Sequence, residues 1–139
     1  SDHLGFAERL RREYGVPVFV HSADAERAKG GPKPPTPMGR KRLGALAGFF
    51  LYAARKGGAR TRHVTEVVEI ADGQVLPLPG DPRIVALPGH SPGSVAVYVP
   101  EVRAAFVGDA LTTRSVRTGE VGPQPAPFTD EHAEARASL

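Results

Sequence analysis

The chain opens with apolar residues spaced three or four positions apart, with charged residues between them. These apolar positions are Leu4, Ala7, Leu10 and Tyr14. The spacing places them on one face of a helix, so the pattern predicts a helix over residues 4–14. Gly15 follows directly and is the residue type preferred where a helix ends in a left-handed conformation.

Two further elements and one uncharged segment follow this helix. Residues 16–20 (VPVFV) predict a buried strand, and residues 23–28 predict a short helix capped by Ser22 or Asp24. Residues 43–54 (LGALAGFFLYAA) carry no charge and are too short to span a membrane. We expect this segment to be a core helix or a lid over a site, with a basic-flanked interfacial helix as the third alternative.

From residue 64 onward the pattern is that of short strands. Runs rich in β-branched and other apolar residues occupy residues 65–71, 75–78, 84–87, 94–99 and 104–107. Asp72-Gly73 is a strong hairpin-turn signal between the first two runs. Thr129 is expected to cap a last helix that starts at Asp130. Helices followed by a run of strands are typical of an α+β sandwich.

The amino-acid composition limits which metal ligands and which classes of protein are possible. The 139 residues include 16 glycines and 14 prolines, which suit short strands joined by turns, and no cysteine. A disulfide framework and a thiolate metal site are therefore excluded, and any metal must be held by nitrogen and oxygen ligands. No run reaches the roughly 18 apolar residues of a membrane span, and the start shows no signal-peptide pattern. We expect a cytoplasmic protein with no membrane span.

The basic residues are unevenly distributed. Nine of the 18 Lys and Arg residues lie between Lys29 and Arg62, a segment that contains no Asp or Glu. Such a segment could attract an anionic substrate, a phosphate group of a nucleic acid or a membrane surface. The simpler interpretation is a solvated insertion, and it is the one we favour.

The strongest candidate site lies around the last predicted hairpin. If residues 94–99 pair antiparallel with residues 104–107, the start of the first strand lies beside the end of the second. His90 enters this hairpin and Asp109 follows it, so both side chains are expected at the same open end. A carboxylate after an apolar strand needs a partner, because an unpaired buried charge is costly. A metal ion would supply that partner.

Three motifs resemble the metallo-β-lactamase superfamily. Residues 1–5 (SDHLG) resemble the end of its T-H-x-H-x-D-H-x-G motif. Residues 87–94 (LPGHSPGS) resemble its T-P-G-H-T-P-G-S ligand loop, and residues 106–111 (FVGDAL) resemble its strand-plus-aspartate motif. Their order along the chain also fits. The resemblance implies an αββα sandwich of the metallo-β-lactamase type, with residues 1–139 forming a partial domain that is incomplete at both termini.

The same resemblance implies a metal site built from Asp2, His3, His90 and Asp109. Asp2 and His3 would bind a second metal, His90 a first, and Asp109 would bridge both. Two zinc ions are expected in the full-length protein, although these ligands also accept iron or manganese. A hydroxide between the metals would be the nucleophile, and Asp2 would be the catalytic residue that orients it. For Asp2 alone, the alternative is that it caps helix 4–14.

Some parts of the family pattern are missing from these residues. These are the two histidines expected just before Ser1, a further histidine expected beyond Leu139, and the first strands of the fold, without which a sheet edge would be left unpaired. We therefore expect the isolated 139-residue chain to be poorly folded and nearly inactive. The other histidines are not assigned as ligands: His21 is expected to be structural, His63 to lie on the surface, and His132 to lie in the first turn of the last helix.

The resemblance implies a metal-dependent hydrolase that acts on a small ester, thioester or lactone. Glyoxalase II-like thioesterases usually carry a second histidine where this chain has Ser94, which counts mildly against them. Two alternatives remain. One is a phosphodiesterase or nuclease of the same fold that binds phosphates through residues 29–62. The other is a non-catalytic domain without a working metal site.

Overall fold

The computed structural model describes residues 4–33, 47–48, 51–52, 54–55, 63–115 and 119–139. Helices and strands are mixed along these residues, as the α+β prediction requires. The N-terminal part contains α1 (Ala7–Tyr14), β1 (Phe19–His21), the 3-10 helix η2 (Ser22–Asp24) and α2 (Ala25–Ala28). The remainder contains β2 (Val68–Ile70), β3 (Arg83–Ala86), β4 (Val95–Val99), β5 (Ala104–Phe106), the 3-10 helix η3 (Gly108–Ala110), β6 (Thr112–Arg114), β7 (Val121–Gln124) and α4 (His132–Ala137).

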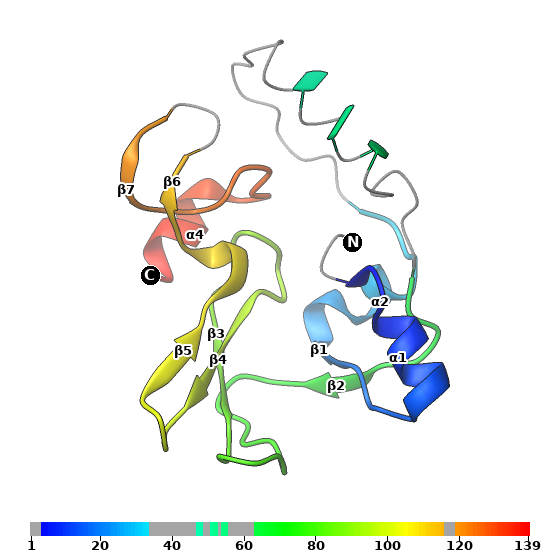
Figure 1. Ribbon diagram of the computed structural model, residues 1–139. Helices are drawn as coiled ribbons and strands as arrows, with labels where there is room; N and C mark the ends of the chain where they lie inside the picture. The colour runs from blue at the N-terminus through cyan, green and yellow to red at the C-terminus, as the bar shows by residue number, and fades with distance from the viewer. Residues whose placement is uncertain (1–3, 34–46, 49–50, 53, 56–62, 116–118) are drawn as a thin grey trace.

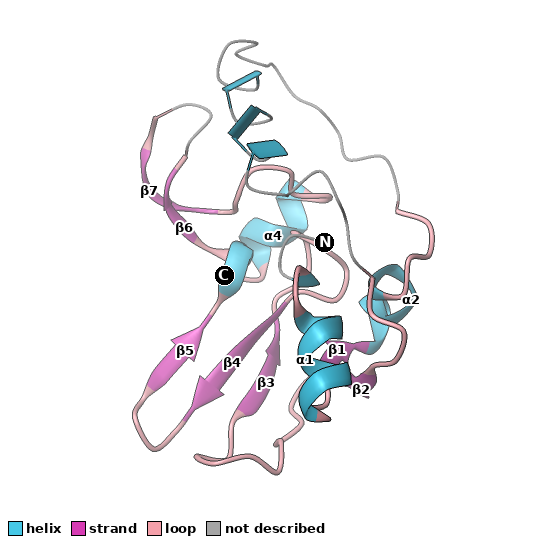
Figure 2. Ribbon diagram, turned by 45° about the vertical axis from the view of Figure 1, so that its right-hand side comes forward, coloured by secondary structure: helices cyan, strands magenta, loops and turns pink. Residues whose placement is uncertain are grey.

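The described strands form three small sheets. β1 and β2 pair in parallel, with Val20 opposite Glu69. β3, β4 and β5 form an antiparallel sheet in that order, and β6 pairs antiparallel with β7. In Figure 1 the parallel pair lies beside α1 and α2, whereas α4 and the β6–β7 hairpin lie toward one end of the three-stranded sheet. Figure 2 shows this sheet from another direction.

The hydrophobic core joins the first two sheets. Its buried residues are Ile70 on β2, Leu76 in the segment between β2 and β3, and Ile84 on β3. Each is at most 4% exposed, and together they form one cluster. The partly buried residues packed against them are Phe19, Val95 and Val97. Packing of these β-branched and aromatic side chains between the parallel pair and the antiparallel sheet therefore fixes β4, from which the candidate site extends.

Several sequence predictions need correction here. The Asp72-Gly73 turn is present, with φ of +73° at Gly73, but it does not join a hairpin, because β2 pairs with β1. The predicted strand 75–78 is reduced to an isolated bridge between Val75 and Arg83. The predicted strand 16–20 is shorter and lies at Phe19–His21. The hairpin of β6 and β7 was not predicted, since its sequence includes Gly122 and Pro123 and resembles a loop.

Helix α1 ends as predicted but packs differently. Gly15 adopts a left-handed conformation with φ of 66° and its N–H donates to the Arg11 carbonyl. No residue of the helix is buried, and Leu10 and Tyr14 are 40% and 72% exposed. The helix is instead attached through polar contacts: the Glu8 carboxylate accepts from the backbone N–H and the hydroxyl of Thr65, at 3.1 and 2.9 Å.

Glu8 gives a pH-dependent prediction. Hydrogen bonds from Arg11, and then from the Thr65 backbone, lower the pKa of Glu8 from 4.5 to about 2. Because the folded state holds this carboxylate ionised, the associated stability is present above pH 4.5 and is lost as the pH falls toward 2. We expect Glu8→Gln to flatten the acid limb of stability between these values, measured as urea midpoints across pH. Glu13→Gln, which removes an exposed partner of Arg9, is the control and should leave that limb unchanged. Equal acid slopes in wild type and Glu8→Gln would contradict the prediction.

The uncharged segment 43–54 lies mostly outside the described residues. Its described residues are helical, and Leu51 and Tyr52 are 64% and 63% exposed. The prediction of a core helix is therefore wrong for these positions, whereas the lid and interfacial alternatives stay predictions. Among the residues that the structure describes, every helix is too short or too polar to cross a lipid bilayer.

Candidate metal centre

The His90 loop joins β3 to β4 at one end of the antiparallel sheet. β3 and β4 are in register from Arg83 opposite Tyr98 to Ala86 opposite Val95. Beyond that last pair the Leu87 N–H donates to the Ser94 carbonyl at 2.8 Å, which closes the loop. Within it, the N–H groups of Gly89 and Ser94 donate to the Ser91 carbonyl at 3.1 and 3.2 Å. The loop is thus held by its own backbone before any ligand arrives.

Asp109 lies at the same end of the antiparallel sheet, just after β5, the strand on the other side of β4 from β3. β5 pairs antiparallel with β4, with Val97 opposite Phe106, so the predicted hairpin is confirmed. After β5 the chain turns through Gly108, whose φ is 53°, into η3, which contains Asp109. The His90 Nε2 lies 3.4 Å from the Asp109 Oδ2. The expectation that these side chains meet at the open end of the hairpin is therefore confirmed.

This distance suits two ligands of one metal ion. Zinc binds His nitrogen and carboxylate oxygen at about 2.0–2.2 Å, mostly in tetrahedral geometry. Two such ligand atoms on one ion lie roughly 3.4 Å apart by trigonometry. The two side chains are 22% and 35% exposed, so an ion would reach them from solvent. His90 and Asp109 thus fit the metal that the motifs imply.

Thr129 contacts the ring nitrogen of His90 that does not face Asp109. Its side chain is fully buried at 0% exposure, and its Oγ1 lies 3.2 Å from the His90 Nδ1. The same hydroxyl donates to the Ala126 carbonyl at 2.6 Å. The prediction that Thr129 caps the last helix is wrong: α4 begins at His132, and its N-cap residue is Glu131, which makes no side-chain cap. A threonine hydroxyl can cap a helix or bond a histidine ring equally well, so the residue type alone favoured a cap.

The segment 126–131 holds both candidate ligands through its backbone. The Ala126 N–H donates to the Asp109 carbonyl at 3.0 Å. The Asp130 N–H donates to the His90 carbonyl at 3.2 Å, and the Glu131 N–H donates to the Gly89 carbonyl at 2.9 Å. These bonds attach the turn before α4 to the loop and to η3, so the separation of the two ligands depends on residues far away in the sequence.

A polar cluster from α2 and its preceding turn supports the other side of the loop. The Ser91 hydroxyl donates to the Asp24 carboxylate. The Arg27 Nη1 lies 2.7 Å from the Asp130 Oδ2 and 3.9 Å from the Asp24 Oδ1. The three charged side chains are only 10–22% exposed, so their mutual attraction is weakly screened. The His90 loop is therefore hydrogen-bonded to Asp24, just before α2, on one side and to the segment 126–131 on the other.

This cluster also corrects the predicted cap of the second helix. The Ala23 N–H donates to the His21 Nδ1 at 3.3 Å, so His21 caps the 3-10 helix η2 that precedes α2. Asp24 occupies the N-cap position of α2, which is one of the two predicted alternatives. Asp24 makes no side-chain cap because its carboxylate is turned toward the His90 loop. The structural role expected for His21 is confirmed. His63 and His132 are exposed, as expected for residues that are not ligands.

Asp2 and His3, the other two predicted ligands, lie outside the described residues. Within the described ranges, no group of three or more His, Cys, Asp or Glu side chains is placed to hold a metal ion. The alternative that Asp2 caps the first helix is contradicted, because the N-cap residue of α1 is Phe6. Asp2 and His3 therefore stay predicted ligands.

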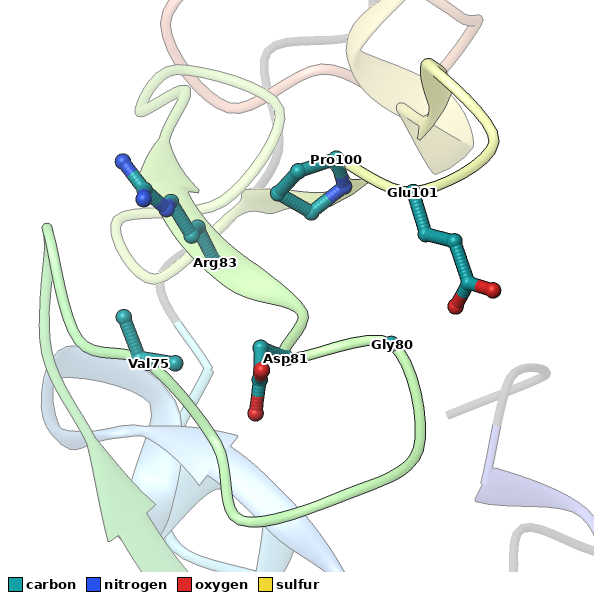
Figure 3. A pocket seen from close by; sticks show the side chains of 6 residues that line it. All are labelled: Val75, Gly80, Asp81, Arg83, Pro100 and Glu101. Atoms are coloured by element: carbon teal, nitrogen blue, oxygen red, sulfur yellow. The ribbon is translucent and has the colours of Figure 1, made fainter.

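A cavity of about 450 Å³ lies away from this centre. Figure 3 shows its lining residues, which are Val75, Gly80, Asp81, Arg83, Pro100 and Glu101. Arg83 pairs with Tyr98, at the end of β3 and β4 opposite to the His90 loop. The cavity and the candidate metal centre are therefore separate features of the sheet.

Comparison with known protein families identifies the fold. The family model described as the metallo-beta-lactamase superfamily matches residues 1–139. The chain belongs to this superfamily.

Individual relatives agree with this assignment. The chain is 27% identical over 146 residues to the probable metallo-hydrolase YflN of Bacillus subtilis (strain 168), covering 99% of this chain and 54% of that protein. It is 30% identical to TTHA1623, solved in a di-iron-bound form, with a TM-score of 0.61 and coverage of 99% and 56% of the two chains.

A more distant structure shows the fold alone. The BLEG-1 B3 metallo-beta-lactamase is 23% identical, with a TM-score of 0.60 and coverage of 99% of this chain and 56% of that one. The predicted metallo-β-lactamase fold is therefore confirmed. The chain spans about half the length of the relatives that it matches.

Proposed function

We propose that the natural protein containing this chain is a metal-dependent hydrolase of a small ester, thioester or lactone. The observation that carries the proposal is the 3.4 Å separation of the His90 Nε2 and the Asp109 Oδ2. Membership of the superfamily supports it, as does the similarity to a probable metallo-hydrolase. His90 and Asp109 would bind metal, with Asp109 bridging to a second ion held by Asp2 and His3.

The bound metal would supply a water of lowered pKa as nucleophile and a Lewis acid for the scissile carbonyl. Asp2 would orient that nucleophile and accept its proton, which makes it the proposed catalytic residue. Zinc suits the nitrogen and oxygen ligands. Iron suits them as well, and the di-iron form of a relative at 30% identity supports it as the main alternative.

The surroundings of the loop favour an ester or lactone over a glyoxalase II-like thioester. Ser94 occupies the position where such thioesterases usually carry a histidine. Its Oγ accepts from the Ser91 N–H at 2.9 Å and lies 3.0 Å from the Ser91 Oγ, so it serves the loop itself. The exposed Leu51 and Tyr52 belong to the segment proposed as a lid, where they would contact an apolar part of the substrate.

The test measures metal content and substrate class together. We expect native mass spectrometry of the natural protein to show two metal ions. We expect hydrolysis of p-nitrophenyl acetate and of a lactone to disappear with chelator, return with zinc or iron, and vary little with salt. A protein that cleaves bis-p-nitrophenyl phosphate instead, with binding that weakens steeply with salt, would indicate the phosphodiesterase alternative through residues 29–62. A metal-free protein without activity would indicate the non-catalytic alternative.

A further inference from the structure

The buried hydroxyl of Thr129 restricts the protonation of His90. A threonine hydroxyl carries one proton, and here it is donated to the Ala126 carbonyl at 2.6 Å. Toward the His90 Nδ1, 3.2 Å away, the same oxygen can then act only as an acceptor. The Nδ1 must therefore carry a hydrogen. In a neutral imidazole this leaves the Nε2 with its lone pair.

We propose that Thr129 is a positioning residue that holds His90 in the Nδ1–H tautomer, with the metal-binding lone pair on the Nε2. The Nε2 is the atom that lies 3.4 Å from the Asp109 Oδ2, so the lone pair faces the other candidate ligand. The consequence for metal affinity rests on the proposed function, whereas the tautomer itself does not.

The buried position of Thr129 leaves its hydroxyl no alternative hydrogen-bonding arrangement, which strengthens the tautomer assignment. Its side chain is 0% exposed, so its hydroxyl proton has no access to water as an alternative acceptor. Its acceptor, the Ala126 carbonyl, belongs to a residue whose N–H donates to the Asp109 carbonyl at 3.0 Å. One short segment thus orients the His90 ring through a side chain and holds Asp109 through the backbone. Partners of this kind fix the ring orientation and tautomer of metal-binding histidines.

The tautomer is measured directly in the metal-free natural protein. Nitrogen-15 correlation spectra of the His90 ring distinguish the two nitrogens and show whether each carries a hydrogen. We expect a protonated Nδ1 in the wild type and in Thr129→Ser. In Thr129→Val, which offers no acceptor to the Nδ1–H, we expect the Nε2–H tautomer, which imidazole favours in water. A wild-type protein whose Nδ1 carries no hydrogen would overturn the inference without any variant.

Metal affinity provides the second readout. Thr129→Val keeps the volume of the side chain and removes the hydroxyl, so we expect zinc to bind roughly 10–100-fold more weakly. Thr129→Ser should bind close to wild type. A folded Thr129→Val protein that keeps both the Nδ1–H tautomer and wild-type affinity would refute the role of Thr129. A wild type with the Nδ1–H tautomer that binds no zinc or iron would instead refute the proposed function and leave the tautomer assignment standing.

Discussion

Replacing Asp109 with alanine is expected to abolish metal binding by the natural protein and to reduce hydrolysis to the uncatalysed rate. Asp109 is the proposed bridging ligand, and its Oδ2 lies 3.4 Å from the His90 Nε2. Without the carboxylate, the described part of the centre retains only the histidine nitrogen, and neither proposed metal keeps its full ligand set. Metal content per chain, measured by native mass spectrometry, and calorimetric zinc affinity would record the loss.

The matched control is Glu101→Ala. Glu101 is an exposed carboxylate at the cavity of Figure 3, at the other end of the sheet, so its removal changes net charge by the same amount without touching the centre. We expect its metal content and activity to equal those of the wild type. Thermal unfolding of both metal-free variants separates a lost ligand from a lost fold. A folded Asp109→Ala protein with unchanged metal affinity would refute the assignment of Asp109.

The placement of His90 and Asp109 could be predicted because it depends on local sequence. The apolar runs on both sides of residues 100–103 determine an antiparallel hairpin, and the register follows from a short turn. A residue before the first strand and one after the second must then meet. The glycines and prolines around His90 form a recognisable local motif, which also marked this loop as a ligand loop. Each step used contacts between residues that are close in the sequence.

The support of the centre could not be predicted in the same way. Thr129 looks like a helix cap, and its use as a partner of His90 depends on a contact 39 positions away. Asp24 also looks like a cap, yet its carboxylate accepts from Ser91, 67 positions away. A short polar side chain satisfies several hydrogen-bonding roles equally well, so only the tertiary structure decides among them. For β2, too, the parallel pairing with β1 joins distant segments, and the turn signal at Asp72-Gly73 did not reveal it.

Gly89 is the position where the loop has least freedom. Its φ is +125°, a conformation that side chains rarely adopt. A Cβ built there would lie 2.2 Å from the Ala135 backbone nitrogen and 2.4 Å from its Cα. Ala135 is buried in α4 at 2% exposure, and the Gly89 carbonyl accepts from the Glu131 N–H just before that helix. The loop and α4 therefore approach so closely that only a glycine fits.

Gly89→Ala is therefore expected to displace α4 from the His90 loop. The unfavourable φ costs about 1–3 kcal/mol, and forcing a methyl group against a packed backbone costs a similar amount, about 1–3 kcal/mol. We expect a loss of roughly 2–6 kcal/mol, a large share of the roughly 5–15 kcal/mol that holds a domain folded. Urea unfolding of the metal-free natural protein measures it. Gly122→Ala is the matched control, because Gly122 has a φ of +145° with nothing within 4 Å of its Cβ position, so it retains the conformational cost without the clash. Equal losses in the two variants would show that backbone conformation alone requires Gly89, and that α4 does not press on the loop.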